Sequence, residues 1–157
     1  MKILILVALL VTMITVSCCT SKKRPSHYPD DFKFILKRTS FEYDSQTHKY
    51  NYYDKSIIVV LTDRELNEIY NYAKGIEYLN FPNEFQCTGN DFTVPCFTDN
   101  LEVQYNNKHK QVVNDDCCSK VEKDRPASFD RLVGKITDIL DSKEQVKNLP
   151  KYDIIYM

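Results

Sequence analysis

The sequence of 157 residues contains no tryptophan and only three glycines, at positions 75, 89 and 134. So few glycines exclude the glycine-rich loops with which many nucleotide-binding proteins hold phosphate. A basic excess is also missing, because 21 Lys and Arg stand against 22 Asp and Glu. Nucleic-acid-binding domains carry a clear positive excess, so we expect no nucleic-acid partner.

Aromatic residues are abundant instead, with 11 Tyr and 8 Phe. A chain so rich in large apolar side chains builds a packed core, which excludes a disordered protein. Without the first 17 residues, about 140 remain, the length of one ordinary domain. The sequence has no internal repeat, so we expect a single small domain.

The N-terminal segment has the pattern of an export signal. Lys2 precedes an uncharged apolar stretch, Ile3–Val16. A helix of that length rises about 21 Å, short of the roughly 30 Å hydrocarbon core of a membrane. This favours a signal peptide over a membrane-spanning helix. An uncleaved N-terminal anchor and simple secretion are the alternatives.

The next residues resemble a bacterial lipobox, the sequence that directs lipid attachment to cysteine. In "ITVSC" the small residues Thr15 and Ser17 lie three and one positions before Cys18. The resemblance implies that residues 1–17 are a lipoprotein signal peptide and that Cys18 becomes the acylated N-terminus. Lipoboxes more often have Leu and then Gly or Ala at these two positions, and Cys19 is the alternative site of acylation. We therefore expect an extracytoplasmic protein of the cell envelope, attached to a bacterial membrane through its lipid.

Residues 18–31 are predicted to form a flexible basic tether. The part from residue 20 onward has two prolines and little apolar content, which is typical of a segment that does not fold alone. Lys22, Lys23 and Arg24 would lie just outside the bilayer, where each gains on the order of 1 kcal/mol from anionic head groups. A merely solvated linker fits equally well.

Four further cysteines are expected to form structural disulfides, as is usual in exported proteins: Cys87, Cys96, Cys117 and Cys118. Residues 101–114 read as a hairpin, and a turn centred between positions 107 and 108 gives facing residues whose numbers sum to about 215. That register brings Cys96 near Cys118. We predict the bonds Cys96–Cys118 and Cys87–Cys117. The swapped pairing, Cys96–Cys117 with Cys87–Cys118, is the close alternative. A bond between Cys117 and Cys118 would close a strained ring.

No metal site is predicted, because these cysteines lack the Cys-x2–4-Cys spacing of zinc sites. Asn114–Cys118 is a polar cluster that could bind a cation, but it lacks the residue pattern of a calcium loop.

Alternating and helical patterns predict an α+β domain over residues 32–157. Phe32–Arg38 alternates as a first strand, and residues 41–53 form a hairpin or a loop. Ser56–Leu61 is a continuous β-branched run, typical of a central buried strand.

Two amphipathic helices are expected to cover an antiparallel sheet. Thr62 and Glu65 form a capping-box pattern before a helix that ends at Gly75. Pro126 suits the first turn of the second helix, whose apolar stripe consists of Phe129, Leu132, Val133, Ile136, Ile139 and Leu140. The stretch "LTDRELNEIYNYAKGIEYLNFP", the hairpin and the final "KNLP" resemble small exported envelope proteins of bacteria, often lipoproteins. This resemblance implies a fold and no activity.

Catalytic patterns are weak. His27, His48 and His109 all lie in polar surroundings, and none is placed like a buried base. The adjacent acids Asp30–Asp31 and Asp115–Asp116 would point to opposite sides of a strand, so neither pair forms a carboxylate dyad. We expect no enzyme activity and no cofactor.

The remaining candidate is a group of aromatic residues that either belongs to the core or forms a ligand-binding face: Phe41, Tyr50, Tyr52 and Tyr53. We expect a non-enzymatic binding or interaction module for an envelope protein or a small ligand, including a hydrolase inhibitor. The alternatives are a redox-active or metal-binding protein using Cys117 and Cys118, and a purely structural envelope component.

Overall fold

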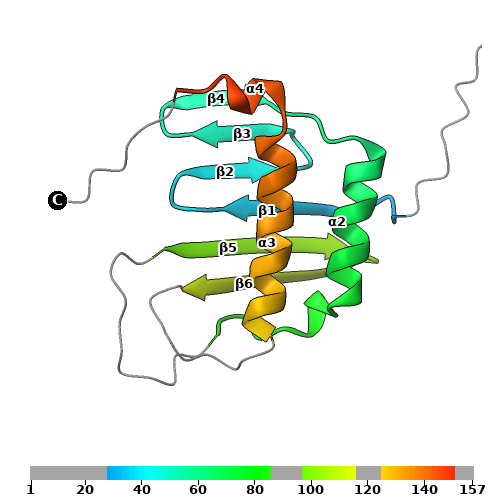
Figure 1. Cartoon of the computed structure of the whole chain (residues 1–157). Coiled ribbons are helices and arrows are strands. Elements are labelled where there is room, and N and C mark those ends of the chain that lie inside the picture. The colour runs from blue at the N-terminus through cyan, green and yellow to red at the C-terminus, as the bar shows by residue number, and fades with distance from the viewer. Residues whose placement is uncertain (1–27, 86–96, 116–124, 151–157) are drawn as a thin grey trace, which may run out of the picture.

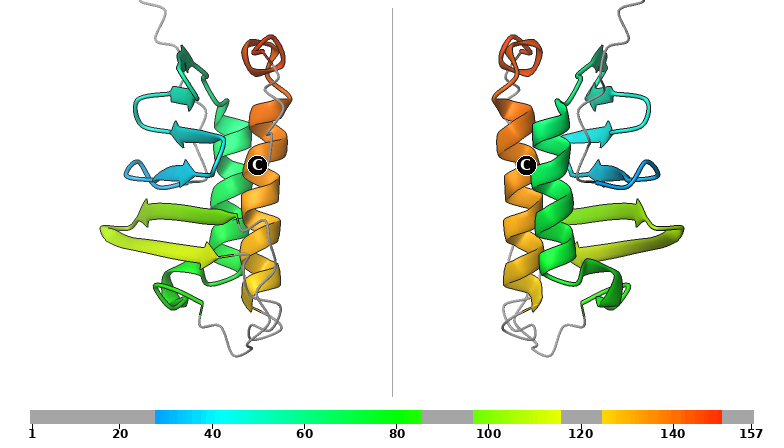
Figure 2. Two further views of the ribbon diagram at one scale, coloured as in Figure 1. Left: turned by 90° about the vertical axis from the view of Figure 1, so that its left-hand side faces the viewer. Right: turned by 90° about the vertical axis from the view of Figure 1, so that its right-hand side faces the viewer.

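The structure, a computed structural model, describes residues 28–85, 97–115 and 125–150. Within these residues the chain forms one antiparallel sheet of six strands, with both long helices on the same face (Figures 1 and 2). The predicted α+β fold, an antiparallel sheet covered by two amphipathic helices in a single small domain, is confirmed.

The elements follow the chain in this order: β1 (Lys33–Lys37), β2 (Phe41–Asp44), β3 (Lys49–Tyr52), β4 (Lys55–Ile58), α2 (Asp63–Gly75), the 3₁₀ helix η2 (Tyr78–Asn80), β5 (Thr98–Tyr105), β6 (Lys108–Asp115), α3 (Arg125–Asp141) and α4 (Glu144–Lys147).

The strand order is β4-β3-β2-β1-β5-β6. Strands β1 to β4 form a meander, and α2 then carries the chain back across the sheet so that β5 pairs with β1. After β6, α3 runs in the opposite direction to α2 and returns to the β4 end of the sheet (Figure 1). The short helix α4 therefore lies in the helix layer at that end (Figures 1 and 2).

The predicted central position of Ser56–Leu61 is wrong, because β4 is an edge strand. Val59 and Leu61 are buried, whereas Ile58 is 56% and Val60 is 57% exposed. A β-branched run indicates a strand, but its place in the sheet depends on where the chain crosses next. Here the crossing through α2 puts β5 at the far side of the meander.

The predicted hairpin is present with a different register. Facing residues of β5 and β6 sum to 213, from the pair Thr98 and Asp115 to the pair Tyr105 and Lys108. The turn consists of Asn106 and Asn107, whose φ angles of 51° and 57° are those of a tight two-residue hairpin turn.

The prediction that Cys96 pairs with Cys118 depended on a sum of 215, so the observed register of β5 and β6 no longer supports it over the swapped pairing. The cysteines of both predicted bonds, like Cys18 and Cys19, lie outside the described residues, so the disulfides and the acylation site stay predictions.

Helix α2 starts as predicted. The Glu65 N–H donates to the Thr62 hydroxyl at 3.3 Å, and the Thr62 N–H donates to the Glu65 carboxylate at 2.7 Å. The helix ends at Gly75, but the left-handed conformation that terminates it belongs to Glu77, with φ 53°.

The core lies between the sheet and the two helices. The predicted stripe of α3 is buried at Phe129, Leu132, Val133, Ile136 and Leu140, and Ile139 is partly buried. The opposite face of the sheet is polar and carries the ion pair Lys37–Glu42 at 3.2 Å and a contact of 2.8 Å between His109 Nε2 and the Glu102 carboxylate. Antiparallel sheets often leave one face to water in this way.

Candidate binding groove

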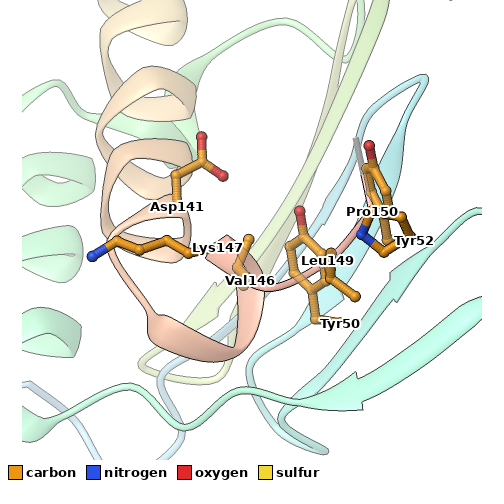
Figure 3. A pocket seen from close by; sticks show the side chains of 7 residues that line it. All are labelled: Tyr50, Tyr52, Asp141, Val146, Lys147, Leu149 and Pro150. Atoms are coloured by element: carbon orange, nitrogen blue, oxygen red, sulfur yellow. The ribbon is translucent and has the colours of Figure 1, made fainter. Parts of the chain in front are cut away.

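The best candidate for a site is a groove of about 420 Å³ between the sheet and the C-terminal helices, at the β4 end of the domain (Figure 3). We call it the Tyr50–Asp141 groove. Its lining comes from β3, from the end of α3 and from α4 with the residues after it: Tyr50, Tyr52, Asp141, Val146, Lys147, Leu149 and Pro150.

The alternation of β3 places its two groove residues on the helix side of the sheet. Tyr50 is almost fully buried, and its ring stacks on Phe41 with centroids 5.0 Å apart. The Tyr52 ring lies 6.4 Å from Tyr50, is only half-buried, and contacts the exposed Tyr53 edge-on at 4.8 Å. The predicted aromatic group therefore divides: Phe41 belongs to the core, and Tyr50 and Tyr52 also form a groove wall.

The opposite wall is built by α4, which sequence reasoning missed. Val146 and Leu149 are one helical turn apart, and the Leu149 N–H donates to the Val146 carbonyl at 3.0 Å. Both side chains pack against the edge of the core. The spacing of these two apolar residues in "KEQVKNL" is the sequence signal that could have indicated the short helix.

Asp141 supplies the charge of the groove. It lies at the exposed rim, at the last position of α3, and its carboxylate is directed toward the groove (Figure 3). Desolvation raises the pKa of Asp141, the nearby carboxylate of Asp138 raises it further, and Arg38 partly opposes both. Within the described part of the chain, no hydrogen bond or ion pair is found for the Asp141 carboxylate.

The nearby cations have other partners. Arg38 binds Asp99 through two nitrogens, at 2.6 and 3.3 Å. The Lys147 amine binds Glu144 at 3.0 Å and is directed away from the groove in Figure 3. Among the described residues, Asp141 thus forms no ion pair, although the charge of Arg38 acts on it.

The lining offers apolar contacts and hydrogen-bonding groups. Burial raises the pKa of Tyr50, and the charge of Asp141 adds to the effect, so the Tyr50 hydroxyl stays protonated. The lining combines apolar contacts, two phenolic hydroxyls, the Asp141 carboxylate and Lys147, and it contains no Ser, Cys or His.

The histidines are not brought together. His48 lies in the β2–β3 turn with φ 58°, and its Nδ1 is buried without a hydrogen bond. His109 lies on the polar face of the sheet, paired with Glu102. His27 is outside the described residues.

The acidic pairs have separate positions. Asp31 accepts backbone hydrogen bonds from the β5–β6 turn, whereas Asp30 is exposed. Asp115 ends β6, and Asp116 lies outside the described residues. Asn114, the first residue of the predicted polar cluster, donates to Asp130 at 2.8 Å.

The described ranges contain no group of three or more His, Cys, Asp or Glu that could hold a metal ion. In the same ranges, no helix has the length and apolar character needed to cross a membrane. No known protein family and no curated protein matches this sequence.

Proposed function

We propose that this protein is a lipid-anchored component of the bacterial cell envelope whose folded domain is a non-enzymatic binding module. The observation that carries the anchor is the position of Cys18, directly after the small residues Thr15 and Ser17 and the apolar stretch Ile3–Val16.

The contacts of the first described residues support a short tether. The Tyr28 hydroxyl donates to Asp63 at 2.9 Å, so contacts with the domain begin four residues before the predicted boundary at residue 32. Burial, followed by this hydrogen bond, raises the pKa of Tyr28 to about 12. Ten residue steps separate Cys18 from Tyr28, and an extended chain of that length spans about 35 Å at most. An anchor at Cys18 would therefore keep the domain close to the membrane surface.

The Tyr50–Asp141 groove supports the binding role. Pockets that bind ligands are mostly apolar and aromatic, with a few polar groups that set orientation. The groove has this composition, with Asp141 as the orienting charge.

Metabolic labelling tests the anchor. The full chain is expressed with its own N-terminus in a Gram-negative bacterium that is fed an alkyne analogue of palmitate. We expect the Cys18→Ser variant to lose the label and to leave the membrane fraction, because the acylated thiol is missing. The matched Cys19→Ser variant should keep the label. A label that only Cys19→Ser removes would move the site to Cys19, and an unlabelled wild-type protein would overturn the anchor.

A further inference from the structure

We propose that β4 is a docking strand for an extended peptide segment of a partner protein. The peptide pairs its backbone with the outer edge of β4 and directs alternate side chains into the layer of the Tyr50–Asp141 groove. This inference rests on the proposed binding role and names the kind of partner that the module takes.

The backbone of β4 has groups available for such pairing. The Val59 N–H donates to the His48 carbonyl at 2.8 Å, and Ile58 faces Lys49 in the same register. In an antiparallel pair, hydrogen-bonded and non-hydrogen-bonded positions alternate. The N–H and C=O groups of Ser56 and Ile58 consequently point away from β3. Among the described residues, no strand lies on that side of β4.

Strand β4 begins with a lysine, Lys55, and ends with two isoleucines, Ile57 and Ile58. Edge strands usually carry charges, prolines or bulges that prevent pairing with another chain. Here Ile58 and Val60 are both more than half exposed, and with Tyr53 they make up the exposed large apolar side chains of the described residues. All three lie on β4 or directly beside it.

The other edge of the sheet shows the contrast. Strand β6 is covered by a segment of its own chain, because the Val113 N–H donates to the Asn83 carbonyl at 2.8 Å and Glu84 forms a bridge with Val113. The chain thus supplies backbone partners for the edge at β6, whereas no strand of the described residues lies beside the outer edge of β4.

The groove adjoins this end of the sheet, because its lining comes from β3, the strand next to β4, and from the end of α3 with α4 and the residues after it. On the helix side of the sheet, Ile57 faces Tyr50, so a strand added to β4 directs every second side chain into the layer between the sheet and α4. Val146 and Leu149 line that layer from the opposite side. In strand addition, backbone hydrogen bonds give affinity and pockets for alternate side chains give specificity. A volume of about 420 Å³ is enough for one or two large side chains.

Charge defines the peptide further. Among the described residues Asp141 forms no ion pair, although the charge of Arg38 acts on it, and Asp138 lies one helical turn earlier. A Lys or Arg on the peptide would form an ion pair with Asp141. The partner segment is therefore extended, apolar at alternate positions, and basic where it passes the end of α3.

A library of random octapeptides displayed on phage, panned against the full-length chain in detergent micelles, tests this inference. We expect enriched sequences to alternate apolar residues and to contain a Lys or Arg. A synthetic peptide of the enriched sequence should bind Ile58→Pro about tenfold more weakly, because proline removes an outward N–H and blocks close approach. Ile58→Thr keeps the N–H and the β-branch, so it should bind nearly as well as wild type.

Two further variants test the edge of β4 and the charge of the groove separately. If Ile58→Pro does not fold, Ile58→Lys serves instead, because a cation at the edge repels a basic peptide while the ladder with β3 stays intact. Asp141→Asn should weaken binding of the enriched peptide. It should leave the affinity for an analogue of that peptide in which Lys is replaced by Ala unchanged.

Three results would overturn the inference: no enrichment, binding that Ile58→Pro leaves intact, or a concentration-dependent dimer that Ile58→Pro dissociates, which would make a second copy the occupant. If Asp141→Asn weakens peptide binding and Ile58→Pro does not, the peptide binds in the groove without pairing with β4. The labelling of Cys18 is measured separately, so failure of the anchor is distinguishable from each of these results.

Discussion

The carboxylate of Asp31 accepts the backbone N–H of Asn107 at 2.6 Å. It also accepts the N–H of Asn106 at 3.0 Å, so one side chain at the start of the domain holds both residues of the β5–β6 turn. These hydrogen bonds, that from Asn107 first, lower the pKa of Asp31. They fix the point at which the proposed tether enters the fold.

Replacing Asp31 with Asn should make the domain less stable at neutral pH. The folded-state pKa of Asp31 lies below the ordinary aspartate value of about 3.9, so its stabilisation is present above that value and is lost as the pH falls through the folded-state pKa. Urea unfolding of wild type and Asp31→Asn should differ at pH 7, and the difference should shrink as the pH falls below the ordinary aspartate pKa. A difference that does not change with pH would contradict this assignment.

Tyr43→Phe should lower the free energy of unfolding by about 1–3 kcal/mol. The buried Tyr43 hydroxyl donates to the Val59 carbonyl at 3.0 Å, and its removal leaves that carbonyl without this donor inside the core. The control is Tyr72→Phe, whose half-buried side chain lines a surface hollow between α2 and α3. Chemical denaturation measures both, and equal small losses would show that the Tyr43 hydrogen bond contributes little.

Gly134→Ala should stabilise the protein by about 0.5–1 kcal/mol, because glycine inside a helix is less favourable than alanine. Gly134 lies in the middle of α3, and an added Cβ would meet no atom within 4 Å. Gly75→Ala, at the last position of α2, is the matched control and should give a smaller gain. A destabilised Gly134→Ala variant would mean that this position needs glycine for a contact outside the described residues.

Lys143→Met should destabilise the corner between α3 and α4 by about 1–2 kcal/mol. The Lys143 amine binds both oxygens of the Glu65 carboxylate, at 2.7 and 2.8 Å, and both side chains are largely buried. Burial raises the pKa of Glu65, but the hydrogen bonds from Lys143 and Thr62 outweigh it and lower the pKa overall. A double-mutant cycle with Glu65→Gln measures the coupling, and strictly additive losses would contradict a direct interaction.

The features that could be predicted from the sequence are those set by residues close together in the chain. The capping box at Thr62, the stripe on α3 and the hairpin each depend on residues close together in the chain, and each was found. The edge position of β4 depends instead on how α2 crosses the sheet, which no local pattern encodes. The hairpin register was misplaced because two asparagines in the left-handed conformation replaced the expected turn one residue later.

The groove was predicted only in part. Tyr50 and Tyr52 were predicted as candidates from their aromatic character. The alternation of residues along a strand shows which side chains share a face, but it does not predict which helix packs against that face. Asp141, Val146 and Leu149 reach the groove because α3 returns to the β4 end of the sheet and α4 turns there. Such a site forms from segments about 90 residues apart in the sequence, so spacing alone could not reveal it.

The intact mass of the full chain, expressed with its own N-terminus in a bacterium and measured before and after reduction and alkylation, tests the central claim most directly. The proposed anchor predicts a chain that begins at Cys18 and carries diacylglycerol, with four thiols that react only after reduction. An unlipidated mass with Cys117 and Cys118 alkylated before reduction would contradict both the anchor and the disulfides, and would favour redox or metal chemistry at that pair.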